Sequence, residues 1–160
     1  APVFNLLHRP TQLAAAPAFD SEGFPNRDLD LIRDGVLESF AIGWYGSHKL
    51  GRPMTSGLTN LVVAPGHTAL ADIIAATDRG ILLGRFSGGE PNQNLDFSGV
   101  AKNSFYVEGG KVIGPITETM IAGNFQTAIQ SIRAISSETV DTGYSCYPWL
   151  ATTGITISTK

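Results

Sequence analysis

The 160-residue sequence contains one cysteine, Cys146, so no disulfide can form within the chain. It also lacks an Asn-x-Ser/Thr glycosylation site, an apolar stretch of transmembrane length and a recognisable signal peptide. These absences argue against a secreted, disulfide-stabilised protein and against contact with a membrane. The first residues also lack a charged n-region and an initiator methionine, and the simplest interpretation of these features together is a soluble cytoplasmic protein or a fragment of a longer one.

Charged residues are scarce and show no clustering of one sign. They make up 16% of the chain, the net charge is −3, and lysine and arginine do not occur in runs. A surface that binds duplex DNA usually needs a basic face, so we expect no direct nucleic-acid partner. The hydrophobic share of 42% indicates a packed core, and the length predicts a single domain over residues 1–160.

Histidine is rare and scattered, which restricts the available chemistry. His8, His48 and His67 are widely spaced, and none belongs to the His-Glu pattern on one helical face that zinc peptidases need. We interpret each as a surface or loop side chain. His48 follows Ser47 directly, but adjacent side chains rarely point at each other, so a Ser-His pair is not predicted there.

Cys146 lies in the aromatic sequence Tyr-Ser-Cys-Tyr-Pro-Trp, where a packed, inert thiol is the more usual outcome than a nucleophile. Cys146 and His48 are nevertheless the remaining candidates for catalytic residues. The glycine pair in Ser87-Gly88-Gly89 resembles a phosphate cradle but lacks the Gly-Lys-Ser/Thr ending. A turn that brings two backbones together explains it better, and we predict no nucleotide, no metal site and no cofactor.

The pattern of apolar residues predicts an α+β fold of mostly antiparallel sheet layers with two or three short helices. Asp34-Gly35 and Gly109-Gly110 have the composition of two-residue hairpin turns, in which both residues take a positive φ. Glu108 would then face Lys111 across the second turn. Strands are predicted over residues 29–32, 36–42, 58–63, 80–86, 100–108, 111–116 and 155–158.

Helices are predicted over residues 43–50, 68–76 and 124–134, the first ended by Gly51 and the last capped by Asn124. Four prolines in residues 1–26, without a steady period, indicate an irregular N-terminal segment over residues 1–18. The expected core is the set of apolar residues on the inner faces of these elements: Leu61, Val63, Leu70, Ile74, Leu82, Phe105, Val107, Ile129 and Ile132.

Several motifs between Phe19 and Ser158 make the chain resemble the C-terminal domain of the TldD/PmbA family, the modulators of DNA gyrase. The most specific part runs from Gly88 to Asn124. A departure stands at Ser47-His48, where relatives commonly have Ala-Arg. The matching motifs are Phe19-Asp-Ser-Glu-Gly23, Asp34-Gly-Val-Leu-Glu-Ser-Phe40, Tyr45-Gly46, Lys49-Leu-Gly51, Arg85-Phe-Ser-Gly-Gly89, Asp96-Phe-Ser-Gly-Val-Ala-Lys102, Glu118-Thr-Met-Ile-Ala-Gly-Asn124, Pro148-Trp-Leu150 and Gly154-Ile-Thr-Ile157.

The resemblance implies a relation to zinc peptidases. Peptidase-type members carry a His-Glu-x-x-x-His helix upstream of this domain and a further cysteine ligand within it. PmbA-type members lack the zinc helix and partner the active subunit. Cys146 stands near the position of that cysteine, but its sequence setting resembles the metal-free branch, so no metal role is transferred to it.

Three hypotheses follow for the function. The leading one is a non-catalytic PmbA-like domain that contributes to a peptide-binding cleft or a subunit interface. Its partners would be a TldD-like peptidase subunit or a second copy in a homodimer, with unfolded peptide as a further ligand. The second is an enzyme that uses Cys146 with a distant histidine as nucleophile or metal ligand. The third is a purely structural homo-oligomer.

Overall fold

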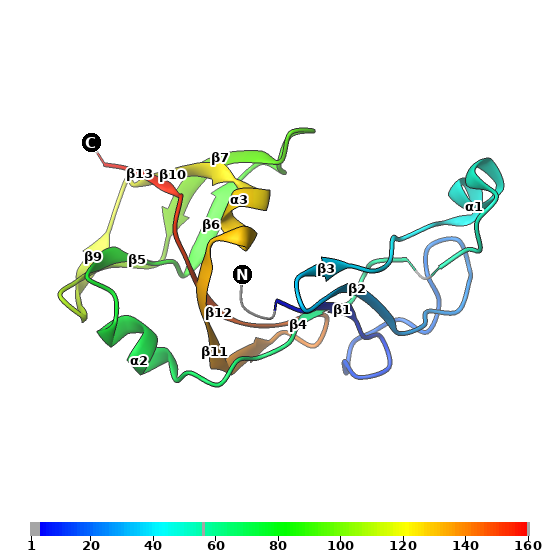
Figure 1. Cartoon of the computed structure of the whole chain (residues 1–160), viewed down its shortest axis with the longest axis horizontal. Helices are drawn as coiled ribbons and strands as arrows, with labels where there is room; N and C mark the ends of the chain where they lie inside the picture. Colours follow the sequence, from blue (N-terminus) through cyan, green and yellow to red (C-terminus); the bar gives the residue numbers. More distant parts are fainter. Residues whose placement is uncertain (1–3, 56, 160) are drawn as a thin grey trace. The chain divides into compact units, whose positions relative to one another are not determined.

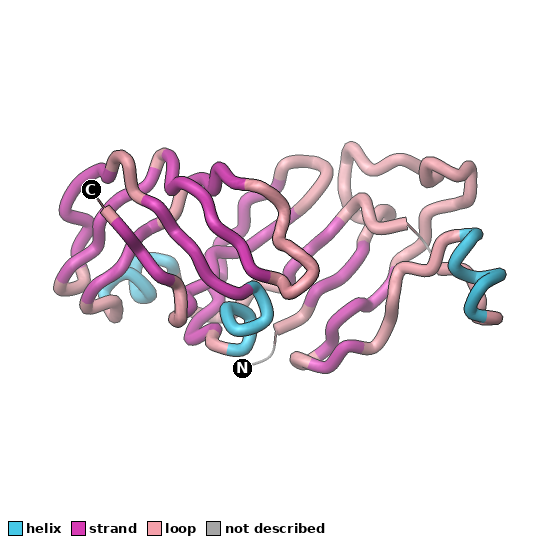
Figure 2. Tube along the Cα trace, turned by 90° about the horizontal axis from the view of Figure 1, so that it is seen from above, coloured by secondary structure: helices cyan, strands magenta, loops and turns pink. Residues whose placement is uncertain are grey.

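The structure is a computed structural model that describes residues 4–55 and 57–159. Over these residues the chain forms thirteen strands and three short helices, and most of the paired strands run antiparallel (Figure 2). The predicted α+β class is confirmed. None of the helices in this described part is long and apolar enough to cross a membrane.

The chain divides into two compact units. The N-terminal unit comprises the described residues between 4 and 66 together with 138–149. The C-terminal unit comprises residues 67–137 and 150–159. Two strands, β11 (Ile132–Asp141) and β12 (Cys146–Thr152), contribute residues to both units. The expectation of one domain over residues 1–160 stays a prediction.

The N-terminal unit is built on the strand order β4-β1-β2-β3, with β12 parallel to β4 (Figure 1). The strands are β1 (Leu6–His8), β2 (Leu29–Arg33), β3 (Val36–Leu37) and β4 (Leu61–Val63), followed in the same sheet by β12 and β11. Helix α1 (Trp44–Leu50) lies at one end of this unit, away from these strands, and ends at Gly51 in the left-handed conformation. The predicted helix over residues 43–50 is confirmed.

Strand β1 contradicts the irregular segment expected over residues 1–18 at residues 6–8, whereas residues 9–18 contain no helix or named strand. It is paired on both sides, with β2 and with β4, and is therefore an interior strand of the sheet. With three residues it is too short to show a period in the sequence, and Pro10 follows soon after it. Its place in the sheet depends on partners more than 20 residues away, which local patterns do not reveal.

Both predicted hairpin turns are confirmed. Asp34 and Gly35 have φ angles of 51° and 77° and connect Arg33 to its partner Val36. Gly109 and Gly110 have φ angles of 55° and 75° and connect Glu108 to Lys111. Positive φ at both central residues matches the right-handed twist of the strands that each turn joins.

The C-terminal unit contains two antiparallel sheets and two helices. One sheet has the order β13-β10-β7-β6 and the other β5-β8-β9. The elements are α2 (Leu70–Ala75), β5 (Arg79–Leu82), β6 (Arg85–Gly88), β7 (Asp96–Lys102), β8 (Ser104–Glu108), β9 (Lys111–Ile116), β10 (Met120–Asn124), α3 (Phe125–Gln130) and β13 (Thr156–Ser158).

Two stretches predicted as single strands are each divided between these sheets. Residues 80–86 break at Gly84, which separates β5 from β6, and residues 100–108 break at Asn103, which separates β7 from β8. Asn103 has a φ of 50°, which ends the extended conformation. Apolar runs that continue across both breaks concealed them in the sequence. Strands β3 and β4 are likewise shorter than predicted.

Helix α3 is shorter than the predicted helix over residues 124–134. Asn124 caps it as expected, because its Oδ1 accepts a hydrogen bond from the backbone N–H of Thr127 at 3.2 Å. The helix ends at Gln130, and Ile132 opens the ten-residue strand β11. Pairing with β12 in the sheet outweighs the helical spacing of the apolar residues, as long-range contacts commonly do.

The core agrees with the prediction in part. Val63, Val107 and Ile132 are buried, whereas Leu61, Leu70, Ile74, Leu82 and Ile129 are half-buried. Phe105 was predicted in the core but is 40% exposed, because an irregular register between Tyr106 and Val107 breaks the alternation of β8. Further buried apolar residues are Phe4, Leu13, Leu31, Ile73, Ala101, Ile121 and Ile135.

Candidate functional site

The two sequence candidates for catalysis occupy different settings in the N-terminal unit. Cys146 is the first residue of β12, half-buried, with a free thiol. His48 is an exposed residue of α1 whose ring packs edge-on against Trp44, with 4.5 Å between ring centroids. The structure does not bring these two side chains together, since α1 lies away from the sheet that contains β12 (Figure 1).

His8 is also separated from Cys146. Val62 is the register partner of both Leu7 and Cys146, so these three side chains share one face of the sheet. His8 is paired with Leu61 and therefore faces the opposite side, because neighbours along a strand alternate. The backbone of the sheet stands between the imidazole and the thiol.

The described residues contain no group of three histidine, cysteine, aspartate or glutamate side chains that could hold a metal ion. His67 belongs to the C-terminal unit.

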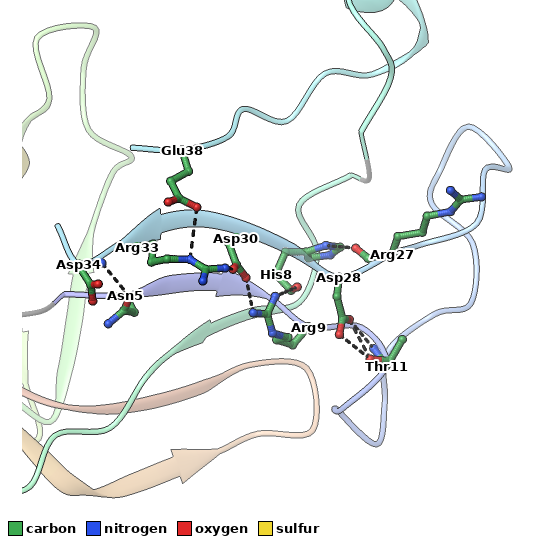
Figure 3. A network of polar contacts seen from close by, with 10 residues as sticks. All are labelled: Asn5, His8, Arg9, Thr11, Arg27, Asp28, Asp30, Arg33, Asp34 and Glu38. Carbon is green, nitrogen blue, oxygen red and sulfur yellow. Dashed lines mark hydrogen bonds and ion pairs between the residues drawn. The ribbon is translucent and has the colours of Figure 1, made fainter. Parts of the chain in front are cut away.

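The sequence interpretation of His8 as a surface or loop side chain is wrong. His8 is fully buried, and its Nδ1 lies 3.0 Å from the backbone carbonyl oxygen of Arg27 (Figure 3). A carbonyl can only accept, so Nδ1 carries the proton in the neutral ring and Nε2 does not. Among the described residues Nε2 has no hydrogen-bond partner. The sequence offers no local signal for this burial, because the three residues of β1 are too few to show a period.

The electrostatics around His8 favour its neutral form. Burial lowers the pKa of the imidazole, as does the nearby positive charge of Arg9 to a smaller extent. The hydrogen bond to the Arg27 carbonyl and the negative charge of Asp28 raise this pKa, but their effect is smaller than that of burial and the net pKa is lowered.

An ion-pair network lies beside this histidine. Asp30 on β2 accepts hydrogen bonds from Arg9 and Arg33, and the Nε of Arg33 lies 3.3 Å from a carboxylate oxygen of Glu38 (Figure 3). The hydrogen bond from Arg9, with a further contribution from Arg33, lowers the pKa of Asp30. Asp30 raises the pKa of Arg33 in turn. The network joins the end of β1 to β2 and to the residue after β3.

The motif Phe19-Asp-Ser-Glu-Gly23 holds the beginning of α1. Asp20 Oδ1 accepts hydrogen bonds from the backbone N–H groups of Glu22 at 3.0 Å and Phe24 at 2.9 Å, which fixes a tight turn. Glu22 then extends to α1, where its Oε2 accepts the backbone N–H of Trp44 at 3.1 Å. The turn therefore positions a helix that follows it by about 20 residues.

An exposed apolar segment begins at β3 and continues through α1. We define the apolar segment as Val36, Leu37, Phe40, Trp44, Tyr45 and Leu50, whose side chains are between 54% and 68% exposed. Helix α1 has no buried residue at all. A helix that buries none of its aromatic side chains within its own unit is a candidate for contact with another protein.

The turn predicted at residues 87–89 is wrong for Ser87 and Gly88, which belong to β6, and Gly88 has a packing role there. Gly88 of β6 is paired with Gly99 of β7, and the ring of Phe86 lies over both. A β-carbon would lie 2.5 Å from this ring at Gly88 and 2.7 Å from it at Gly99. The ring also meets Phe97 edge-on, with 5.8 Å between centroids. Of the two glycines in Ser87-Gly88-Gly89, Gly88 thus accommodates an aromatic ring, whereas a β-carbon at Gly89 would meet nothing within 4 Å.

A shallow hollow of about 390 Å³ lies on the other face of the same sheet in the C-terminal unit. Val100, Met120 and Ser158 form a row across three strands at its floor. Lys102 and Glu118 also line it and give it one charge of each sign.

The sequence matches the PmbA/TldA metallopeptidase C-terminal domain over residues 1–159. The chain belongs to the PmbA/TldD family. A metalloprotease PmbA homolog of Haemophilus influenzae is 28% identical over 142 residues, which cover 84% of this chain and 31% of that protein. A zinc metalloprotease TldD homolog of Saccharolobus solfataricus is 26% identical over 133 residues, 75% of this chain and 30% of that protein.

Solved structures of family proteins share the fold. A modulator of DNA gyrase from Bacteroides thetaiotaomicron superposes with a TM-score of 0.84 at 28% identity, over 98% of this chain and 37% of that one. TldE from Thermococcus kodakarensis gives 0.84 at 24% identity, over 98% of this chain and 40% of that one, and shows the fold alone. This PmbA/TldD domain thus spans about a third of the length of the relatives it matches.

Proposed function

We propose that this chain is a non-catalytic, PmbA-like C-terminal domain that contributes a subunit interface to a peptidase-related assembly. The observation that carries the proposal is the apolar segment, which includes two exposed aromatic side chains on a helix without a buried residue. Aromatic residues are enriched at the centres of protein interfaces. Relatives that share this domain are named metalloproteases of both the PmbA and TldD kinds, so a TldD-like peptidase subunit is the proposed partner.

Sedimentation velocity at micromolar concentration tests the interface. We expect the chain to associate with itself or with a TldD-like subunit encoded in the same genome. The double variant Phe40→Ser/Tyr45→Ser should lose this association, because it removes two exposed apolar groups of the segment. Ile113→Ser is the matched control, since Ile113 is 59% exposed on β9, outside the segment. A stable 17.0 kDa monomer in the presence of the subunit, or equal losses in both variants, would contradict the proposal.

The non-catalytic part of the proposal has its own test. The protein, purified without a metal-affinity tag, should contain substoichiometric zinc and should not cleave unfolded peptides when zinc is added. One tightly held zinc per chain, or peptide cleavage abolished by a chelator, would return Cys146 to consideration as a ligand. The wide separation of the histidines in the sequence and the placement of His8 and Cys146 on opposite faces of one sheet support this expectation.

The hollow on the C-terminal unit supports peptide binding as a second role. Its floor of Val100 and Met120 could accept an apolar side chain, and Lys102 could engage a negatively charged group of the same ligand. Fluorescence anisotropy with labelled unfolded peptides tests this role. Met120→Lys should weaken binding, whereas equal binding by this variant would exclude the hollow as the site.

A further inference from the structure

We propose that His8 is an acid-sensitive latch, which holds the loop 9–28 closed at its base and releases it when the imidazole becomes protonated. The loop leaves the sheet directly after β1 and returns at the start of β2. The hydrogen bond from His8 to the Arg27 carbonyl joins these two points at 3.0 Å (Figure 3). The latch is therefore one contact between a buried side chain and the returning backbone.

The interior position of His8 makes protonation costly. The residue is the register partner of Leu29 on one side and of Leu61 on the other, and it is fully buried. A second proton would go to Nε2, which has no acceptor among the described residues. A buried charged N–H without an acceptor is strongly unfavourable, so the imidazolium would have to reach water.

The charged groups around the ring do not supply that acceptor. Asp28 raises the proton affinity of the ring and Arg9 lowers it, while the backbone of Arg27 is already engaged at Nδ1. Asp30 on β2 is occupied by the guanidinium groups of Arg9 and Arg33. On the β4 side the register partner is the apolar Leu61.

Two other contacts also close the base of the loop. Thr11 Oγ1 donates to the carboxylate of Asp28, at 2.8 and 2.9 Å from its two oxygens, and Arg9 pairs with Asp30. Carboxylates titrate near pH 4, whereas histidine titrates near pH 6.5. Histidine is therefore the residue type in this contact set that ordinarily changes charge between about pH 7 and pH 5.

Opening of the loop would also affect the hydrogen bond that holds the start of α1. The loop carries Glu22, which accepts the backbone N–H of Trp44 at the first residue of the helix. When the base of the loop opens, this distant contact loses its support as well. The latch thus connects protonation in the sheet to the position of α1, whether or not α1 belongs to a subunit interface.

Hydrogen exchange between pH 7.5 and pH 5.5, corrected for the intrinsic pH dependence of exchange, tests the latch. The reporters are the N–H groups of Asp20 and Asn26, which donate to Phe24 and Ala18 within the loop. In the native protein the equilibrium constant for opening of the loop should rise by up to tenfold for each unit by which the pH falls, which is the slope for uptake of one proton. In His8→Gln, whose amide can donate to the Arg27 carbonyl without titrating, the pH dependence should disappear. His48→Gln should behave like the native protein.

The same pH dependence in His8→Gln, or its absence in the native protein, would overturn the proposal. Because His8→Gln could fail to fold, an NMR titration of the native imidazole provides an independent measurement. We expect a proton on Nδ1 and a titration midpoint below the 6.5 of an ordinary histidine. A midpoint at or above 6.5, or a proton on Nε2 in the neutral ring, would also reject the latch.

Discussion

A β-carbon at Gly84 would lie 2.0 Å from the backbone carbonyl oxygen of Asn103. The two residues mark the points where the chain passes between the two sheets of the C-terminal unit. Ser104 stabilises the contact: its Oγ accepts the N–H of Gly84 at 3.0 Å and donates to the carbonyl of Lys102 at 2.7 Å. Two crossings that are 19 residues apart in sequence therefore form one closely packed corner.

Gly84→Ala should destabilise the protein, because the added methyl group cannot fit without movement of the backbone at Asn103. We expect a loss of about 1–3 kcal/mol in the free energy of unfolding, the usual cost of an added group that forces the backbone to shift. Urea denaturation monitored by circular dichroism measures it. Gly89→Ala is the control, since a β-carbon there meets nothing within 4 Å. Equal stability of both variants would mean that the corner is looser than the structure shows.

Ile132→Ala should destabilise the protein more than Ile129→Ala. Ile132 is 4% exposed at the start of β11, whereas Ile129 is half-buried on α3. Truncation of a buried isoleucine costs about 2–5 kcal/mol, and truncation of a partly exposed one costs less. Chemical denaturation of the two variants side by side gives the comparison. The reverse order would place the buried face on the helix, as the sequence pattern suggested.

Asn124→Ala should weaken the start of α3. The substitution removes the acceptor for the N–H of Thr127 and also the hydrogen bonds from Nδ2 to Asn94 and Asp96. Loss of such a cap typically costs about 1 kcal/mol. Asn94→Ala is the matched control, because Asn94 joins this network through its backbone carbonyl. Thermal unfolding should separate the two variants, and a larger effect of Asn94→Ala would contradict the capping role.

Asp30→Asn should reduce the dependence of stability on acid pH. The guanidinium of Arg9 holds the pKa of Asp30 below its ordinary 3.8, so the ionised carboxylate favours the folded state. This stabilisation is present above about pH 4 and is lost as the pH falls through the lowered pKa. We expect Asp30→Asn to be less stable than the native protein at pH 7, with a smaller difference at pH 2. Glu90→Gln, in an exposed loop, should leave the difference between these pH values unchanged.

Features set by adjacent residues were predictable from the sequence. The Asp34-Gly35 and Gly109-Gly110 turns each depend on two residues that tolerate positive φ, and the Asn124 cap depends on an oxygen three residues before its donor. The division of strands at Gly84 and Asn103 was not predictable, because each break is explained by the other, far along the chain.

The candidate site was less predictable from the sequence than the fold. Cys146 and His48 are reactive residue types that the sequence offers as catalytic candidates, yet the structure places them apart. The burial of His8 depends on the pairing of β1 with both β2 and β4, which becomes evident only in three dimensions. The hydrogen bond from the Trp44 backbone N–H to Glu22 was likewise not predictable, because the two residues lie in sequence segments about 20 residues apart.

The packing of Phe86 on Gly88 and Gly99 makes the identities of three positions interdependent. A side chain at either glycine would collide with the ring, and a small residue at position 86 would uncover bare backbone between β6 and β7. Single changes at these positions are therefore unfavourable, whereas a simultaneous exchange of the aromatic ring and the glycines could conserve the occupied volume. The glycine-rich motif therefore preserves the space that the Phe86 ring occupies. We expect substitutions at positions 86, 88 and 99 to accumulate together rather than singly.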